Sequence, residues 1–404
     1  MNQIKLGILR EGKVPPDKRV PLTPEQCVKV MEDYPGLEVV VQPSPIRSIT
    51  DEEYIKLGIA LQENLSDCDI IMGVKEVNVS DLIENKQFLF FSHTVKKQSY
   101  NRDLLRAILD KKIQLTDYEV LKNENRKRIT GFGRFAGIVG AYNSFYAFGL
   151  KTGLYSLKRA NECFDREELE NELKKVILPK NTKICLTGIG KVGYGAQEII
   201  DLLPLKEVTP EAYLNERFDS PVYTHLRSAD YYSTIEKESF DKAEFYANPS
   251  EYKSILSRYI ETTDIYLACH FWSQKSPKLL SQVDLQKAKN LKIIGDISCD
   301  IADPIASTLR PSTIASPLYG YDPIAHKEVD FMTEGAITVM AVDNLPCELP
   351  REASEDFGKQ LIKNVFPHLF TGDKDGVIDR GSETTKEGKL NQHYAFLQDY
   401  VDGK

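Results

Sequence analysis

Two basic side chains follow apolar runs that have the length of buried strands. Lys75 follows CDIIMGV, and His93 follows FLFFS. Because ligands of open parallel sheets bind beyond the carboxyl ends of the strands, residues at these positions are candidates for chemistry. Neighbouring cations and partial burial lower the pKa of a lysine, and histidine titrates near neutral pH, so the two form a candidate acid/base pair. Glu76, next to Lys75, and Glu119, after another strand, are placed to tune them.

Each residue of this pair also has a structural explanation that involves no catalytic role. Lys75 could be a solvated lysine after a strand, and His93 a hydrogen-bonded structural histidine. Their equivalent positions at the ends of neighbouring strands, in a chain that also carries a nucleotide-binding motif, favour a function.

Two arginines are candidates for holding a carboxylate group. Arg19 lies in DKRVPLTP, a loop stiffened by prolines, and Arg128 lies in KRITGFGRFAG. A guanidinium group can bind a carboxylate through two parallel hydrogen bonds, which suits recognition of an acidic substrate. A surface ion pair is the alternative for each arginine.

A glycine turn, GIGKVGYGA, follows the run KICLT and opens an amphipathic stretch. Gly188, Gly190 and Gly193 match GxGxxG in the strand-to-helix setting that the dinucleotide fingerprint requires. The first glycine allows a tight turn, the second lets the backbone approach a pyrophosphate, and the third lets the helix pack on the strand. The motif predicts a bound NAD or NADP, and the alternative is a glycine-rich turn without a ligand.

The choice between NAD and NADP depends on the next strand, which we expect near residues 205–208. A carboxylate about twenty residues after the glycines would bind the ribose of NAD, whereas an arginine would meet the 2′-phosphate of NADP. Glu207 and Glu211 are candidates for the first role, and Arg217 and Arg227 for the second. The sequence leaves this choice open.

Short apolar runs alternate with longer amphipathic stretches, the pattern of an α/β protein with parallel sheets. Strands are expected at Ile4–Leu9, Leu37–Val41, Asp69–Val74, Phe88–Ser92 and Ile113–Tyr118, and again at Lys183–Thr187, Asp264–Ala268, Leu291–Ile297 and Ala336–Val342. Helices are expected at Gln98–Leu109, Ala136–Leu154, Arg166–Lys175 and after Asp343. The tyrosine-rich tract Glu211–Tyr259 reads as an insertion.

These elements predict two Rossmann-like, doubly wound parallel-sheet domains with the active site in the cleft between them. Residues 1–140 would form a substrate-binding domain, completed by the C-terminal segment 345–404. Residues 141–344 would form the dinucleotide-binding domain.

The composition narrows the classes of partner. The 404 residues carry 52 Lys and Arg against 60 Asp and Glu, a net charge of −8, so a nucleic-acid or anionic-membrane binder is not expected. No apolar stretch is long enough to span a bilayer and the start does not read as a signal peptide, so we expect a cytoplasmic protein. The seven cysteines form no CxxC pair, which predicts neither a disulfide framework nor a metal site. The oligomeric state cannot be read from these features.

Several motifs resemble a known family. RVPLTP, VKE, SH and GIGKVGYGA, in this order, resemble the alanine dehydrogenase and transhydrogenase superfamily. FSHTVKKQ, LTDYEVLKN, RITGFGRFAG, DISCDI, SPLYGYDP and AVDNLPCELPREAS are similar to the lysine-forming saccharopine dehydrogenases, above all to the lysine-ketoglutarate reductase half of the bifunctional animal and plant enzymes. The resemblance covers nearly the whole chain.

The resemblance implies roles for individual residues. Lys75 and His93 would be the acid/base residues, and Arg19, Gln98, Arg128 and Phe132 would surround the substrate. The cofactor would be lined by Gly188, Gly190, Lys191, Val192, Gly193, His270, Phe271, Val342, Asp343, Asn344 and Leu345.

The implied reaction joins lysine to 2-oxoglutarate through an imine, which a reduced nicotinamide converts to saccharopine. One alternative is alanine dehydrogenase, which uses pyruvate and ammonia. The single carboxylate of pyruvate needs only one cation, whereas lysine and 2-oxoglutarate together carry three carboxylates. The predicted site offers five cations, which are Arg19, Arg128, Lys75, Lys96 and Lys97, and this number argues against alanine dehydrogenase. The other alternative is a catalytically silent NAD(P)-binding sensor, against which the presence of both Lys75 and His93 argues.

Overall fold

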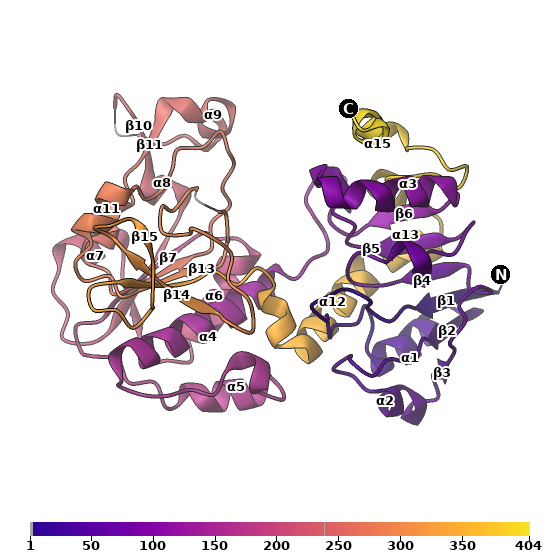
Figure 1. Ribbon diagram of the computed structural model, residues 1–404, viewed down its shortest axis with the longest axis horizontal. Helices are drawn as coiled ribbons and strands as arrows, with labels where there is room; N and C mark the ends of the chain where they lie inside the picture. The colour runs from indigo at the N-terminus through magenta and orange to yellow at the C-terminus, as the bar shows by residue number, and fades with distance from the viewer. Residues whose placement is uncertain (1–2, 238, 302) are drawn as a thin grey trace. The chain divides into compact units, whose positions relative to one another are not determined.

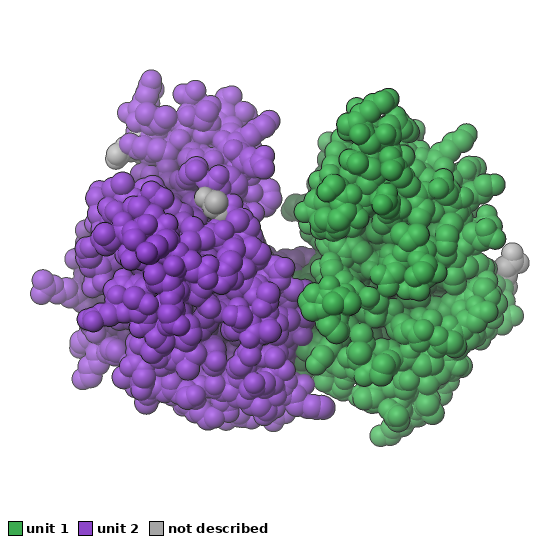
Figure 2. Space-filling model, in the orientation of Figure 1, with its two compact units in different colours: residues 1–132, 350–404 green, residues 133–349 purple. Residues whose placement is uncertain are grey.

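The chain divides into two compact units in a computed structural model that describes residues 3–237, 239–301 and 303–404. Unit 1 comprises Met1–Phe132 and Pro350–Lys404, and unit 2 comprises Gly133–Leu349. Figure 1 traces the chain, and Figure 2 colours the two units separately. Each unit is described below by itself.

Unit 1 is built on a six-stranded sheet in which every strand pairing is parallel. The strand order is β3-β2-β1-β4-β5-β6, which is the doubly wound arrangement. The strands are β1 (Ile4–Ile8), β2 (Leu37–Val41), β3 (Ala60–Leu61), β4 (Ile70–Met72), β5 (Gln87–Phe90) and β6 (Gln114–Asp117). The sequence predicted all of them except β3, whose two residues are too few to show a pattern.

The helices of unit 1 come from both ends of the chain. They are α1 (Pro24–Asp33), α2 (Asp51–Lys56), α3 (Arg102–Asp110), α12 (Pro350–Asn364), α13 (Phe366–Phe370), α14 (Val377–Gly381) and α15 (Gln398–Asp402), with short 3₁₀ turns η1 (Val79–Asp81), η2 (Thr94–Lys96), η3 (Ser99–Asn101) and η7 (Gln392–Leu397). Phe357 and Leu361 of α12 pack in one core cluster with Leu6 and Ile8 of β1. The C-terminal α15 lies beside α3, where Arg106 Nε donates to Val401 O over 2.7 Å (Figure 1).

Unit 2 contains an eight-stranded sheet of order β15-β14-β16-β13-β12-β7-β9-β8. Its strands are β7 (Lys183–Thr187), β8 (Lys206–Glu207), β9 (Val222–Leu226), β12 (Ile265–Ala268), β13 (Ile293–Asp296), β14 (Leu318–Asp322), β15 (Lys327–Val329) and β16 (Ile337–Met340). Six strands from β8 to β16 run parallel, but β14 pairs antiparallel with β16 and with β15. The prediction of an all-parallel sheet is therefore corrected at this edge.

The strand beside β7 differs from the prediction. We expected the segment near residues 205–208 there, but β9 occupies that place and β8 lies outside it. The polar tract 211–259 is thus not only an insertion, because it supplies a strand of the main sheet. The tract also forms α7 (Pro210–Asn215), α8 (Ser228–Tyr231), α9 (Lys242–Ala247), η5 (Pro249–Glu251), α10 (Ser257–Ile260) and a small sheet of β10 (Tyr232–Thr234) and β11 (Tyr252–Ser254).

The remaining helices of unit 2 are α4 (Gly133–Thr152), α5 (Arg166–Leu173), α6 (Lys191–Ile200), α11 (Gln282–Lys287), η4 (Ala160–Glu162) and η6 (Leu345–Glu348). Helices α4 and α6 touch backbone to backbone, because a Cβ on Gly137 would lie 1.9 Å from Val192 O. The whole of α4 therefore packs within unit 2, which moves the first boundary from the predicted residue 140 to residue 132. The second boundary lies after residue 349 rather than after residue 344.

No helix in the described part of the chain combines the length and the apolar character that a membrane span requires.

Candidate active site

The doubly wound order of unit 1 places a switch point between β1 and β4. The chain continues from β1 to β2 on one side and from β4 to β5 on the other, so a crevice opens at the carboxyl ends of β1 and β4. Residues 9–12 and 73–76 line this edge, and Lys75 lies there. His93 follows β5, the neighbour of β4.

Glu11 fixes the turn that carries Lys75. Its Oε1 accepts from the backbone N–H of Val74 over 2.6 Å, and its Oε2 accepts from the N–H of Lys75 over 2.9 Å. Burial and the nearby charge of Asp17 raise the pKa of Glu11 to about 8, against the opposing effect of the two N–H donors.

Lys75 has the environment of an acid/base group. Its side chain is partly buried, and burial is the largest cause of its lowered pKa. The positive charges of Arg19 and Lys13 lower it further, while Glu76 and Asp17 act in the opposite direction. A lysine with a lowered pKa can lose and regain its proton closer to neutral pH.

His93 is held by a carboxylate that is itself paired. Its Nδ1 lies 2.6 Å from Glu76 Oε1, and Glu76 Oε2 accepts from Lys13 Nζ over 2.8 Å. Burial opposes ionisation of Glu76, but the hydrogen bonds with His93 and Lys13 outweigh it and lower the pKa of Glu76 to about 2. An ionised carboxylate can only accept, so Nδ1 carries a proton and Nε2 is the exchangeable position.

Glu119 connects the second nitrogen of the ring to two cations. Its Oε2 lies 3.9 Å from His93 Nε2, and its Oε1 lies 3.3 Å from Lys96 Nζ and 4.0 Å from Arg128 Nη1. The Arg128 side chain is 44% exposed, and its guanidinium lies 5.6 Å above the ring of Phe91. Arg128 is thus a loosely paired cation close to the acid/base residues.

Arg19 is more tightly engaged than the sequence predicted. The side chain is 3% exposed, and its Nε and Nη2 donate to the two carboxylate oxygens of Asp17 over 3.0 and 2.6 Å. The guanidinium also lies 4.2 Å above the ring of Phe132, which stacks on Phe357 with centroids 4.5 Å apart. The edge expected to hold a substrate carboxylate is therefore occupied by Asp17, and the positive charge of Arg19 lowers the pKa of Lys75.

Two of the other predicted residues point elsewhere. Lys97 Nζ donates to Phe396 O over 2.9 Å, so the prediction that it adds a cation to the substrate site is corrected. Gln98 is exposed, and its Oε1 accepts from the Tyr100 hydroxyl over 2.5 Å. A left-handed backbone at Lys97 redirects the chain after His93, which a pattern of residue types does not reveal.

Unit 2 has its own switch point, between β7 and β12, and the glycine turn follows β7. Gly188 has φ +95°, and a Cβ there would lie 2.4 Å from Cys269 O. A Cβ on Gly193 would lie 1.8 Å from Gly188 O. Gly190, the N-cap of α6, differs from both, since a Cβ there would meet nothing within 4 Å. Packing thus explains two of the glycines, and the space in front of Gly190 and the N-terminus of α6 fits a pyrophosphate.

His270 supports the same assignment. The side chain is 5% exposed, its Nδ1 lies 3.1 Å from Thr187 Oγ1, and its Nε2 has no hydrogen-bond partner among the described residues. Burial lowers the pKa of His270 to about 3, so the ring is neutral. A buried, unpaired nitrogen next to the glycine turn is the kind of polar group that a bound ligand satisfies.

The remaining predicted cofactor residues lie at the carboxyl ends of the same parallel strands. Lys191 and Val192 begin α6, Phe271 is 82% exposed after β12, and the segment 342–345 follows β16. In that segment Val342 and Leu345 are buried, Asp343 is exposed, and Asn344 Nδ2 donates to Cys347 Sγ over 2.9 Å.

Comparison with known proteins now bears on the family. Residues 7–139 match the family model of the alanine dehydrogenase/PNT N-terminal domain. This part of the chain is therefore similar to an alanine dehydrogenase/PNT N-terminal domain. The resemblance predicted from the sequence motifs is thereby confirmed, and Lys75, His93 and Glu119 all lie inside the matched residues.

Relatives cover the rest of the chain. The alpha-aminoadipic semialdehyde synthase of Arabidopsis thaliana is 31% identical over 88% of this chain and 37% of its own length. The saccharopine dehydrogenase [NAD(+), L-lysine-forming] of Yarrowia lipolytica is 26% identical over 90% of this chain and 92% of its own. A solved L-alanine dehydrogenase shares the fold with a TM-score of 0.65, 16% identity and 99% coverage of both chains. The chain spans less than half the length of the semialdehyde synthases that it matches.

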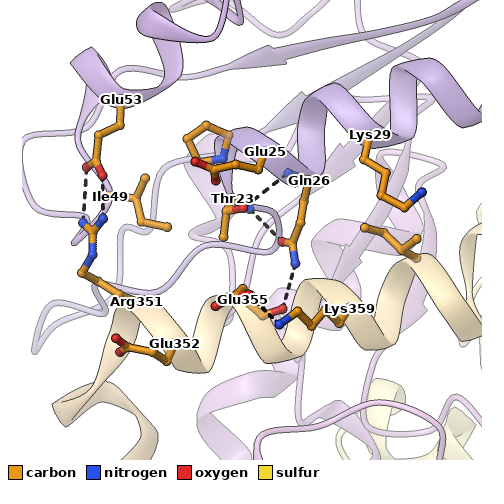
Figure 3. A pocket seen from close by; sticks show the side chains of 12 residues that line it. Thr23, Glu25, Gln26, Lys29, Ile49, Glu53, Arg351, Glu352, Glu355 and Lys359 are labelled. Atoms are coloured by element: carbon orange, nitrogen blue, oxygen red, sulfur yellow. Dashed lines mark hydrogen bonds and ion pairs between the residues drawn. The ribbon is translucent and has the colours of Figure 1, made fainter. Parts of the chain in front are cut away.

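A pocket of about 740 Å³ on unit 1 contains none of the candidate site residues (Figure 3). It lies between α1 and α12, where Arg351 pairs with Glu53 at 2.6 Å and Lys359 with Glu355 at 2.5 Å. Both cations from α12 are thus paired with carboxylates that also line the pocket. Within residues 3–237, 239–301 and 303–404, no cluster of three His, Cys, Asp or Glu side chains is arranged to hold a metal ion.

Sequence reasoning missed Lys13 and the structural role of Asp17. Both lie on the loop that carries Arg19, and their charges act on Lys75. The only signal in the sequence is the density of charge in that loop, which does not say which side chains turn inward.

Proposed function

We propose that the chain is an NAD(P)-dependent saccharopine dehydrogenase of the lysine-forming type, interconverting lysine plus 2-oxoglutarate and saccharopine. The observation that carries this proposal is a lysine with a lowered pKa beside a histidine–glutamate pair at the switch point of unit 1. Similarity over nearly the whole length of the Yarrowia lipolytica enzyme supports the reaction type.

The chemistry needs two groups that exchange protons. Forming the imine requires removal of a proton from the lysine ε-ammonium group and donation of a proton to the hydroxyl that leaves as water. Lys75, whose pKa is lowered, takes the first proton, and Nε2 of His93 supplies the second. A bound reduced nicotinamide supplies the hydride that then reaches the imine carbon.

Arg128 is the residue that we assign to the substrate carboxylate. It is partly exposed and lies close to Glu119, whereas the equivalent edge of Arg19 is taken by Asp17. Lys96, 46% exposed and also near Glu119, is a second cation for the same acid. A dicarboxylic keto acid therefore fits this edge better than pyruvate does.

The residues of unit 2 fit a dinucleotide. Gly188 and Gly190 with the first turn of α6 would hold the pyrophosphate, and His270 Nε2 would gain a partner. Arg227 directly follows β9, the strand beside β7, and is exposed. Glu207 lies on the outer strand β8 and accepts from the Tyr223 hydroxyl over 3.1 Å. The position of Arg227 after β9 supports NADP rather than NAD as the proposed cofactor.

Calorimetric titration of both dinucleotides tests this preference without turnover. Arg227→Ala should weaken NADPH binding about tenfold and leave NADH binding unchanged, since only NADPH carries the 2′-phosphate. Arg217→Ala, a change of the same kind in the loop after α7, is the control. Equal loss of both dinucleotides, or no loss of either, would remove Arg227 from the ribose position.

The reaction itself is tested by following the oxidation of NADH and NADPH by absorbance with paired substrates. Lysine plus 2-oxoglutarate should give turnover, and pyruvate plus ammonium should give far less. Preference for pyruvate and ammonium would make the chain an alanine dehydrogenase instead. Nucleotide binding with no turnover for either pair would support the sensor alternative.

A further inference from the structure

Four buried side chains form an oxygen cluster behind His93. The cluster consists of Ser92, Thr94, Asp117 and Glu383, and each of these side chains is fully buried. Ser92 and Thr94 flank His93, Asp117 ends β6, and Glu383 follows α14 in the C-terminal segment. The mechanism proposed above uses none of them.

The four side chains are joined by short contacts. Asp117 Oδ2 accepts from the backbone N–H of Ser92 over 3.0 Å and from its hydroxyl over 2.5 Å. Ser92 Oγ lies 2.6 Å from Thr94 Oγ1, and Thr94 Oγ1 forms a short hydrogen bond with Glu383 Oε2.

Counting protons shows that the cluster holds an acid. The contacts from Ser92 to Asp117, from Ser92 to Thr94 and from Thr94 to Glu383 each need one proton, but the two hydroxyls supply only one each. The missing proton must come from a carboxyl group. Burial also raises the pKa of both Asp117 and Glu383.

The hydrogen-bond donors identify the protonated carboxyl. Asp117 receives the N–H and hydroxyl of Ser92 and, at its other oxygen, the N–H of Glu119 over 2.6 Å. Glu383 has one close partner, the Thr94 hydroxyl, and only a long contact of 3.4 Å from Ser92 Oγ. Because donors stabilise the anion, Asp117 is the ionised partner and Glu383 the neutral acid. Glu383 then donates its proton to Thr94, the Thr94 hydroxyl donates to Ser92, and the Ser92 hydroxyl donates to Asp117.

The cluster holds the backbone on both sides of the histidine. His93 has φ +54° and ψ +15°, a left-handed conformation that is unfavourable for a residue with a Cβ. Ser92 is fixed by Asp117 and Thr94 by Glu383, so the strained residue lies between two anchored neighbours. Asp117 also anchors the backbone N–H of Glu119, the residue whose carboxylate faces His93 Nε2.

We propose that Asp117 and Glu383 share one proton and act together as positioning residues for His93 and Glu119, which makes the C-terminal segment part of the active site of unit 1. The chemical use of His93 rests on the proposed function. The geometry of its ring does not, and it is measured separately.

The first test is the tautomer of His93, read from ¹⁵N NMR of the full chain without substrate at alkaline pH, where the imidazole is neutral. His93→Gln assigns the signal. The wild type and Glu383→Gln should show one tautomer, with the proton on Nδ1 toward Glu76, since glutamine donates and accepts as the neutral acid does. Thr94→Val, which removes the link to Glu383, should give a mixture of tautomers.

Thr384→Val is the matched control. Its hydroxyl is equally buried in the same segment, but it donates to Ile113 O and accepts from Leu115 N instead of contacting the cluster. This variant should keep the single tautomer. An unchanged spectrum in Thr94→Val, or an equal change in Thr384→Val, would overturn the proposal.

The second test is turnover of two near-isosteric variants. Glu383→Gln should keep kcat within about threefold, whereas Asp117→Asn should lower kcat at least tenfold, because an amide nitrogen cannot accept from Glu119 or Ser92. The KM for the dinucleotide should stay the same in both. The reverse order of effects would overturn the assignment of the proton. If the wild type turns over neither substrate pair, the proposed function fails while the tautomer measurement still decides the positioning role.

Discussion

The two switch points of this molecule share a topology but carry opposite kinds of residue. At the edge of unit 1, Glu11, Lys75 and Glu76 bring several titratable groups together at the ends of β1 and β4. At the equivalent edge of unit 2, the turn after β7 presents glycine backbone, and the buried ring of His270 beside it is neutral.

This difference separates two ways of binding. Backbone N–H groups and a helix N-terminus bind an anion without proton exchange, and glycines leave room for it. Clustered side chains that shift each other's pKa values suit proton transfer. One sheet topology thus supports both uses, and the residues after the strands decide which.

The largest loss of activity should follow a change at the ends of β1 and β4 in unit 1, which we call the charged edge. Lys75→Met keeps the length and the apolar stem but removes the proton-exchanging group, so kcat should fall about 10²- to 10³-fold. Steady-state kinetics measure this loss. Lys97→Met is the control, because that lysine contacts Phe396 instead, and it should keep nearly full activity. A Lys75 variant with most of its rate intact would show that the charged edge is not the catalytic one.

The next largest effect concerns the glycine turn after β7 in unit 2, which we call the glycine edge. Two variants distinguish the glycine that leaves room for the dinucleotide from the glycine that is needed for packing. Gly190→Val fills open space in front of α6, so NADPH affinity should fall about 30- to 100-fold while the melting temperature stays close to the wild-type value. Gly193→Val instead places a Cβ within 1.8 Å of Gly188 O and should lower the melting temperature. Calorimetry with thermal melts distinguishes them. If Gly190→Val binds normally, the turn is packing only.

A smaller effect should follow Arg128→Ala. Because this side chain is 44% exposed, its ion pair with a substrate carboxylate contributes only about 1–2 kcal/mol, or roughly 5- to 30-fold in kcat/KM. The value of kcat/KM should fall for 2-oxoglutarate and stay nearly unchanged for pyruvate, which has only one carboxylate. Rates with the two keto acids measure this. An equal loss for both acids would place Arg128 outside the part of the site that discriminates between them.

The smallest effect is a shift in pH dependence rather than a loss. Lys13 lowers the pKa of Lys75 by its charge and also pairs with Glu76. Lys13→Met removes a positive neighbour and leaves Glu76 less neutralised, and both changes raise the pKa of Lys75. The limb of the kcat/KM profile that reports Lys75 should therefore move to higher pH. A limb that moves to lower pH, or not at all, would contradict the electrostatic coupling.

The sequence predicted the parts of this comparison that depend on local pattern. Alternation of apolar runs and helices located nearly every parallel strand, and the carboxyl-end rule selected Lys75 and His93 from a long chain. The glycine motif located the second switch point. Each of these features lies within a short segment of the sequence, so it can be predicted without knowledge of the fold.

The missed features depend on contacts between distant segments. Glu383 lies 291 residues after Ser92, and nothing in the C-terminal segment marks it as a partner of that serine. The place of β9 beside β7 was missed because strand pairing is not a property of either strand alone. Arg19 was expected to bind a substrate carboxylate, and its pairing with Asp17 was missed because that pairing depends on how the loop folds inward.

The central claim is that the charged edge of unit 1 exchanges protons while the glycine edge of unit 2 binds the dinucleotide. Dinucleotide binding by the double variant Lys75→Met/His93→Gln tests this claim most directly. With both acid/base residues removed, turnover should be lost. The dissociation constant for NADPH, measured by calorimetry, should stay within about threefold of the wild-type value, since the glycine edge in unit 2 is unchanged. Loss of NADPH binding in a folded double variant would contradict the account, because the charged edge would then belong to the nucleotide site.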